Sequence, residues 1–98
     1  MNLTGKQRSY LRGEANDLAP ITQIGKDGLS DSLVSQIEEC LEDHELIKIR
    51  INDNNTITAK EAATELAERT NSHIVQIIGS VLILYKANPE IDGFNLPS

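Results

Sequence analysis

Aromatic residues and cysteines are scarce in this sequence of 98 residues, which contains one cysteine, one phenylalanine, two tyrosines and no tryptophan. The lone Cys40 excludes an internal disulfide and leaves no cysteine pair for a zinc site. The core therefore has to be built from isoleucine, leucine, valine and alanine. No apolar run approaches the length of a membrane span, and the N-terminus lacks a signal-peptide pattern. We therefore expect a cytoplasmic protein without membrane contact.

Residue clusters typical of catalysis or cofactor binding are also missing from the sequence. His44 and His73 stand far apart, and neither belongs to a group with the spacing of metal ligands. Cys40 falls on the apolar stripe of an expected helix, where we interpret it as a small buried hydrophobic residue. Neither a Walker loop nor a Ser-His-Asp set is present. We expect no enzyme, no cofactor and no metal.

The charge of the chain is negative overall but unevenly distributed. The formal net charge is −6 at pH 7, which counts against nucleic-acid binding when it is taken alone. However, residues 1–26 contain four cations and two acids, a net of +2, whereas residues 27–98 contain five cations and thirteen acids, a net of −8. A field divided in this way can attract phosphate on one surface and repel it elsewhere.

The periodicity of the apolar residues predicts one small α/β domain. Three helices are expected at about residues 5–16, 31–43 and 59–70, each beginning after a serine or threonine that can cap it. Four strands are expected at about residues 21–24, 46–51, 73–78 and 81–85. The order α-β-α-β-α-β-β predicts a four-stranded mixed sheet packed with three helices in a single domain.

The strand patterns also predict how the layers are arranged. In the strand at 46–51, the isoleucines point one way and Lys48 and Arg50 point the other, as in a half-exposed strand. The strands at 73–78 and 81–85 are apolar on both faces, which predicts central positions for both. Gly79-Ser80 between them has the signature of a type II′ hairpin. Right-handed crossovers would place the second and third helices on one face, leaving the first helix to cover the other.

The loop Gly25-Lys26-Asp27-Gly28 is the strongest candidate binding motif. Two glycines let the backbone approach a ligand closely, and the helix capped by Ser30 offers unpaired N–H groups to a phosphate. Lys26 adds a cation, and the Gly-x-x-Gly loop of KH domains clamps nucleic-acid backbone in the same manner. Taken alone, the motif is better explained as a plain strand-to-helix turn, so the loop by itself does not decide the function.

A second candidate is the basic first helix. Lys6, Arg8 and Arg12 have no acidic residue three or four positions away on this helix, and the two arginines stand at a repulsive i, i+4 spacing. An anionic partner would turn that repulsion into attraction. A solvated helix face is the alternative interpretation. Lys48 and Arg50 lie on the exposed side of their strand and are further candidates for this patch, although for each taken singly an ordinary solubilising charge is the better explanation.

Several blocks of the sequence resemble one known family in their order along the chain. They are Leu3-Thr4-Gly5-Lys6-Gln7-Arg8, Leu11-Arg12, Ile24-Gly25-Lys26-Asp27-Gly28-Leu29, His44-Glu45-Leu46-Ile47-Lys48 and Val75-Gln76-Ile77-Ile78-Gly79. Together they resemble the YhbY-like CRM-domain family of bacterial ribosome-maturation proteins. The resemblance covers nearly the whole chain, from Leu3 to Lys86.

The resemblance implies a fold similar to the C-terminal domain of translation initiation factor three. It implies that residues 1–86 form a CRM RNA-binding domain, followed by a loosely attached tail at 87–98. The implied partner is ribosomal RNA in precursors of the large ribosomal subunit. Ribosomal proteins are possible further partners, and we expect the protein itself to be a monomer. RNA would be held by the Gly-x-x-Gly loop and the basic helix. An alternative is a protein-interaction module that docks its acidic helices on basic ribosomal proteins.

Overall fold

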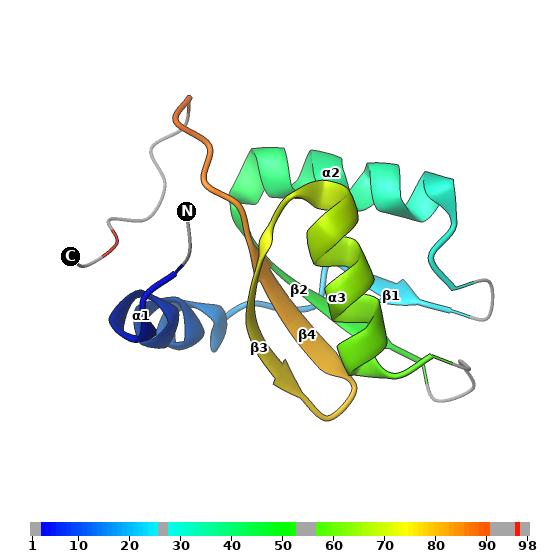
Figure 1. The fold of residues 1–98 in the computed structure, drawn as a ribbon, viewed down its shortest axis with the longest axis horizontal. Helices are drawn as coiled ribbons and strands as arrows, with labels where there is room; N and C mark the ends of the chain where they lie inside the picture. Colours follow the sequence, from blue (N-terminus) through cyan, green and yellow to red (C-terminus); the bar gives the residue numbers. More distant parts are fainter. Residues whose placement is uncertain (1–2, 26–27, 53–56, 91–95, 97–98) are drawn as a thin grey trace.

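Three helices and four strands form a mixed sheet with helices on both of its faces, as the sequence predicts (Figure 1). The computed structural model describes residues 3–25, 28–52, 57–90 and 96. The elements in chain order are α1 (Gly5–Ala15), β1 (Thr22–Ile24), α2 (Asp31–His44), β2 (Leu46–Ile51), α3 (Ala59–Thr70), β3 (His73–Ile78) and β4 (Val81–Tyr85).

Local side-chain capping fixes where the helices begin and end. The backbone N–H of Gln7 donates to the Thr4 hydroxyl at 3.1 Å, and the Gln7 side chain accepts from the Thr4 N–H at 3.0 Å. Ser30 and Thr58 cap α2 and α3 through equivalent bonds to backbone N–H groups. Asn71 ends α3 in the left-handed conformation, at φ 56° and ψ 47°. These caps satisfy backbone groups that each helix end leaves unpaired.

The sheet has the strand order β1-β2-β4-β3, with β1 and β2 parallel and the other pairs antiparallel. The predicted central position is confirmed for β4 and wrong for β3, which forms an edge. Beyond an irregularity between Ile74 and Gln76, the end of β3 is open to solvent, with Ile77 37% and Ile78 55% exposed. Apolar composition alone does not distinguish a buried strand from an edge strand whose last residues are uncovered.

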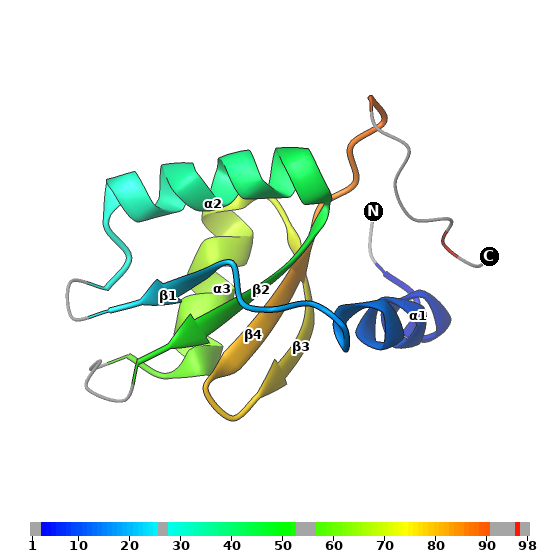
Figure 2. The same ribbon diagram turned by 180° about the vertical axis from the view of Figure 1, so that it is seen from behind.

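The helices α2 and α3 cover one face of the sheet and form the larger core with it. Ile37 of α2 and Leu66 of α3 are fully buried against Ile47, Ile49 and Leu84 of the central strands. Figure 2 shows the two helices on the same side of the strands, as the sequence predicts. Every second side chain of β2 and β4 therefore packs against the two helices, and the side chains between them project from the opposite face of the sheet.

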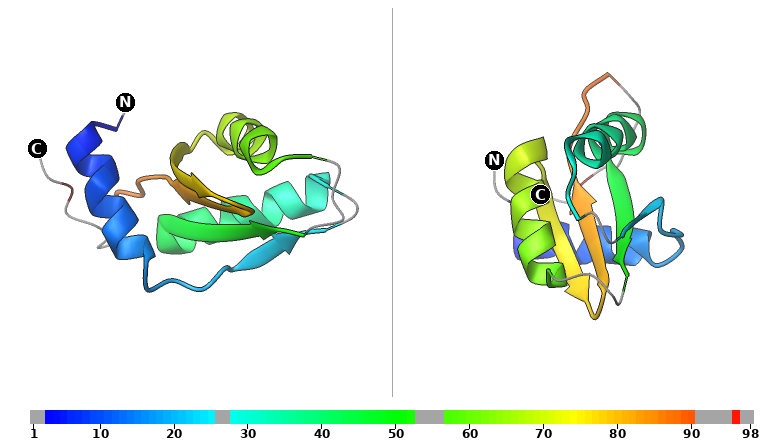
Figure 3. Two further views of the ribbon diagram at one scale, coloured as in Figure 1. Left: turned by 90° about the horizontal axis from the view of Figure 1, so that it is seen from below. Right: turned by 90° about the vertical axis from the view of Figure 1, so that its right-hand side faces the viewer.

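The helix α1 packs on that opposite face, also as predicted. Leu11 and Ala15 are fully buried against a smaller core that includes Leu46, Ile83 and Tyr85. Seen from below, α1 lies across one end of the strands only (Figure 3). No helix of the described residues lies over the remainder of this sheet face.

Glu45 attaches the start of the C-terminal tail to the domain. This residue is 4% exposed and has a positive φ of 61°, and its carboxylate accepts a hydrogen bond from the Asn88 N–H. The Asn88 side chain donates to the Glu42 carbonyl at 2.8 Å. Leu96 packs against the smaller core beside α1. The described part of the tail is therefore held at both of these points.

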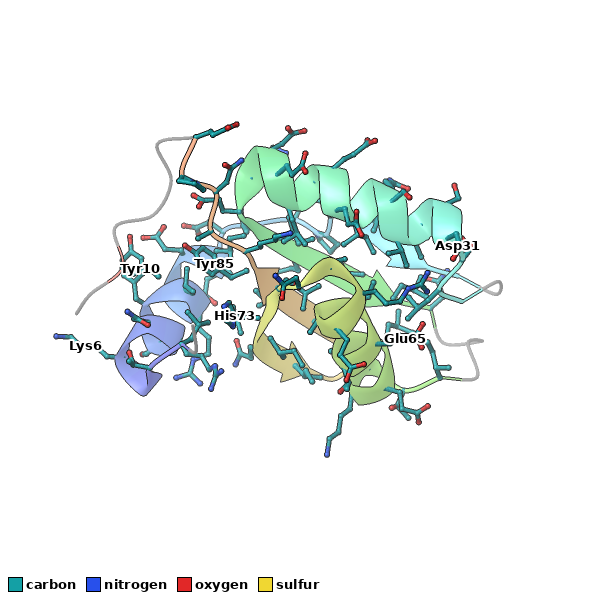
Figure 4. The ribbon with its side chains drawn as sticks, turned by 45° about the horizontal axis from the view of Figure 1, so that its top comes forward. Lys6, Tyr10, Asp31, Glu65, His73 and Tyr85 are labelled. Carbon is teal, nitrogen blue, oxygen red and sulfur yellow. The ribbon has the colours of Figure 1, made fainter. Side chains whose placement is uncertain are left out.

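The pKa of the half-buried His73 depends on the contact between α1 and the sheet. It lies opposite Tyr85 on the face that α1 covers, and Figure 4 shows it beside that helix. Burial lowers the pKa of His73, and nearby positive charge, including the Arg8 guanidinium, lowers it further. The folded state therefore favours the neutral imidazole.

We predict that the free energy of unfolding decreases as the pH falls below about 6.5, the ordinary pKa of histidine in an unfolded chain. Because the folded pKa is lowered, the stabilising contribution is present above that pH and is lost as the pH falls through the folded pKa. Urea unfolding between pH 5 and 8 should show a shallower decrease for His73→Gln. Identical pH dependences for the two proteins would contradict the assignment.

Candidate nucleic-acid interface

The three cations of α1 are all exposed to solvent. Among the residues that the structure describes, the recorded ion pairs belong to Arg69, so Lys6, Arg8 and Arg12 have no paired carboxylate there. The one acid of α1, Glu14, instead interacts with the Tyr10 hydroxyl, and this charge adds to burial in raising the pKa of Tyr10. Arg12 also lies in the last helical turn, where the helix dipole favours a cation. The helix thus presents unneutralised positive charge.

The Gly-x-x-Gly loop follows β1 at the edge where two parallel strands end together. The Asn52 N–H donates to the Ile24 carbonyl at 3.0 Å, which ties the ends of β1 and β2. The Gly28 N–H donates to the Gly25 carbonyl at 3.0 Å, and Gly28 has a φ of +67° that favours glycine. Lys26 and Asp27 lie outside the described residues. A backbone hydrogen bond therefore joins the two glycines shortly before the Ser30 cap of α2.

Arg69 braces the segment between this loop and α2, a role that its place in the sequence does not reveal. Its guanidinium lies 2.7 Å from the Asp31 carboxylate and 3.2 Å from that of Glu65. It also donates to the Leu29 carbonyl at 3.3 Å. These carboxylates raise the pKa of Arg69, the Asp31 hydrogen bond most of all. The pair with Arg69 offsets the negative charge that Asp31 would otherwise present beside the loop.

Lys48 and Arg50 project from the sheet face that α1 only partly covers. Lys48 lies opposite Ile83 of β4, and Arg50 lies between Val81 of β4 and Gln23 of β1. Lys48 is half-buried and Arg50 is exposed. The four strands contain no aspartate or glutamate. This surface is therefore positive without a local counter-charge from the strands.

The loop and the basic helix are not brought together. They lie at opposite ends of a molecule whose longest dimension is 39 Å (Figures 1 and 2). Lys48 lies near the α1 end, where its carbonyl accepts from the Ile21 N–H at 2.9 Å. Arg50 lies further along β2, toward the end that leads to the loop. The two strand cations therefore connect the two predicted sites along one face.

Charge is separated between the layers of the fold. The helices α2 and α3 contain eight carboxylates and two cations, a net of −6 that equals the charge of the whole chain. Together α1 and the four strands contain five cations and one carboxylate, a net of +4. Figure 4 shows Lys6 on α1, and Asp31 and Glu65 on α2 and α3, well apart from it.

The uncovered sheet face is hollowed where it meets the end of α1. The hollow has a volume of about 310 Å³ and is lined by Asn16, Pro20, Lys48, Gln76, Ile78, Val81 and Ile83. Of these residues only Lys48 was a candidate from the sequence. The sequence predicts a central and covered position for β3, so it does not indicate that Gln76 and Ile78 are open to a ligand.

The described residues show no sign of a nucleophilic or metal-binding centre. Cys40 is half-buried beside the larger core, and burial, followed by the Asp43 and Glu39 charges, raises the pKa of its thiol. A raised pKa keeps the thiol protonated and poorly nucleophilic. Within the described ranges, no group of three or more histidine, cysteine or acidic residues is placed to hold a metal ion. None of the described helices is long and apolar enough to cross a membrane.

Comparison with known proteins finds relatives along almost the entire chain. The Probable RNA-binding protein YqeI of Bacillus subtilis is 41% identical over 95 residues, covering 97% of this chain and 99% of the relative. An RNA-binding protein of Haemophilus influenzae is 33% identical over 88 residues, covering 90% and 89% of the two chains.

A solved structure is similar as well. The solution structure of protein SAV1595 from Staphylococcus aureus has a TM-score of 0.80 and 43% sequence identity, covering 97% of this chain and 99% of that one. The family model for the CRS1/YhbY (CRM) domain matches residues 3–86. This match extends from the residue before the α1 cap to the residue after β4. The chain belongs to the CRS1/YhbY (CRM) domain family.

Proposed function

We propose that this protein binds structured RNA across the face formed by α1, the uncovered part of the sheet beside it and the Gly-x-x-Gly loop. The observation that carries the proposal is the separation of charge, which leaves +4 on α1 and the strands and −6 on the two helices behind them. The relatives named as RNA-binding proteins support the choice of RNA as the polyanion. The site residues are Lys6, Arg8, Arg12, Gly25, Lys26, Asp27, Gly28, Lys48 and Arg50.

The acidic total does not oppose binding at this face. Salt screens charge over about 8 Å at physiological ionic strength, whereas the two shorter dimensions of the molecule are 25 and 23 Å. A phosphate beside Lys48 or Arg50 is therefore largely screened from carboxylates on the outer surfaces of α2 and α3. The acidic layer instead disfavours the reverse orientation, so the protein presents the same face to each RNA.

The contacts should be mainly with the RNA backbone. Aromatic side chains that could stack on bases are few, and Tyr10 and Tyr85 both pack against the smaller core. Cations distributed along one face of a molecule whose longest dimension is 39 Å match successive phosphates of a folded RNA. We infer a non-catalytic role in which the protein holds ribosomal RNA in immature large subunits and acts as an assembly factor.

The first test removes charge from the proposed face. We expect Arg8→Gln/Arg12→Gln to weaken binding to ribosomal RNA fragments about tenfold, because two cations are lost. The slope of the logarithm of the affinity against the logarithm of the salt concentration should become shallower by about 1–2, the loss expected for one or two phosphate contacts. Fluorescence anisotropy at several salt concentrations measures both quantities. Lys26→Glu should weaken binding in the same assay if the loop participates.

The matched control neutralises a cation on the acidic layer. Lys60 is exposed on α3, and Lys60→Gln should leave both the affinity and its salt dependence unchanged. Both arginines are exposed, so the thermal stability of the double variant should stay close to that of the wild type. Equal affinities for the wild type and the double variant would show that α1 is not part of the interface.

The assembly role is tested by sedimentation of cell lysate through a sucrose gradient. We expect the wild-type protein to migrate with free precursors of the large subunit, and Arg8→Gln/Arg12→Gln to remain at the top of the gradient. Glu39→Lys/Glu68→Lys should still migrate with precursors, since both acids are exposed on the opposite layer. Glu61 and Glu65 are less suitable for this control because they contact Thr58 and Arg69.

Two results of the gradient would contradict the assembly role. Wild-type protein found only at the top, or only with mature ribosomes, would exclude association with precursors. Displacement by Glu39→Lys/Glu68→Lys, with the arginine variant still bound, would favour docking of the acidic helices on basic ribosomal proteins instead.

A further inference from the structure

We propose that the hollow on the uncovered sheet face binds one unpaired nucleobase of the RNA. This inference rests on the proposed RNA binding and adds to it, because it assigns a subsite for a base within a face otherwise suited to phosphates. The hollow lies between the end of α1 and the β3–β4 hairpin, beside Lys48. A base held there would fix the position of the protein along an RNA that its other contacts recognise only by shape.

The size and the floor of the hollow suit a base. Its volume of about 310 Å³ is at the low end for small-ligand pockets, which is the scale of a single nucleoside. Ile78, Val81 and Ile83 form an apolar floor, and Ile78 at 55% exposure is the most exposed large apolar side chain among the described residues. Covering that side chain with the flat face of a base would remove apolar surface from water on both molecules.

The polar groups around this floor match the edge of a base. Asn16 and Gln76 line the hollow, and their side-chain amides have no recorded partner among the described residues. Each amide offers both donors and an acceptor, the combination that base edges require. None of the described residues that line the hollow is an aspartate or glutamate. Lys48 at the hollow and Arg50 further along β2 can hold the phosphates on either side of the inserted nucleotide.

An unpaired nucleotide fits this arrangement better than paired RNA does. Bases within an A-form helix are stacked and face a deep groove that side chains do not enter, whereas bases in loops and bulges can be splayed out. The α1 helix at one end of the face and the Gly-x-x-Gly loop at the other would contact the RNA backbone on either side of the unpaired base. The ligand is therefore an unpaired base next to a structured stem.

The test compares two hairpin RNAs of the same sequence that differ at one bulged position. One carries a bulged adenosine, and the other carries an abasic ribose that preserves the backbone, the charge and the interruption of the stem. We expect the wild-type protein to bind the adenosine RNA about fivefold more tightly in fluorescence anisotropy, because covering the apolar lining with one base removes apolar surface from water. Equal affinity for the two RNAs would overturn the base subsite and leave RNA binding itself intact.

Variants on the two sides of β3 locate the effect. Ile78→Ser should abolish the preference for the adenosine while leaving the affinity for the abasic RNA unchanged. Ile77→Ser is the matched control, because Ile77 is also exposed, at 37%, but lies opposite Leu82, whose side chain belongs to the helix-covered core. Gln76→Ala, which removes an amide and no floor residue, should reduce the preference independently.

The remaining outcomes are also decisive. A preference that persists in both Ile78→Ser and Gln76→Ala would place the base elsewhere and overturn the proposal. An equal loss of affinity for both RNAs in these two variants would show that the hollow contacts backbone rather than a base. If the wild type bound neither RNA, the proposed function would fail, and this subsite with it.

Discussion

Alternation along β2 is the constraint on which the interface depends. Ile47, Ile49 and Ile51 are buried against α2 and α3, so Lys48 and Arg50 must project from the other face. A shift of one residue in the register would place both cations beneath the helices, where unpaired charge is strongly disfavoured. The same register that builds the larger core thus also aims the strand cations. Folding and the proposed binding therefore select one arrangement of β2.

The partial cover provided by α1 determines what the opposite face can do. Leu11 and Ala15 seal one end of it, and the uncovered remainder keeps Ile78 and Arg50 in contact with solvent. A sheet covered on both faces would be more stable but would offer no concave surface. Of the nine carboxylates that belong to helices and strands, eight lie on α2 and α3, so the opposite side of these elements is left for a polyanion. An acidic chain of this kind is expected to bind RNA in only one orientation.

Much of this architecture could be predicted from the sequence because it is encoded locally. Thr4 with Gln7, Ser30 and Asn71 mark helix ends through bonds within a few residues, and the alternation at 46–51 defines β2. The edge position of β3, and hence the hollow, depends instead on the order of strands that are distant in the chain. The separation of the loop from α1 and the brace of Arg69 on Asp31 are long-range features of the same kind.

The central claim is that RNA contacts the α1 and open-sheet side of the protein and not the helical layer. Backbone amide chemical shifts measured during titration with a ribosomal RNA hairpin test it most directly. The account predicts that the largest changes cluster in α1, in β2 around Lys48 and Arg50, and at the exposed end of β3. Changes concentrated on the outer surfaces of α2 and α3, with those segments unaffected, would contradict it.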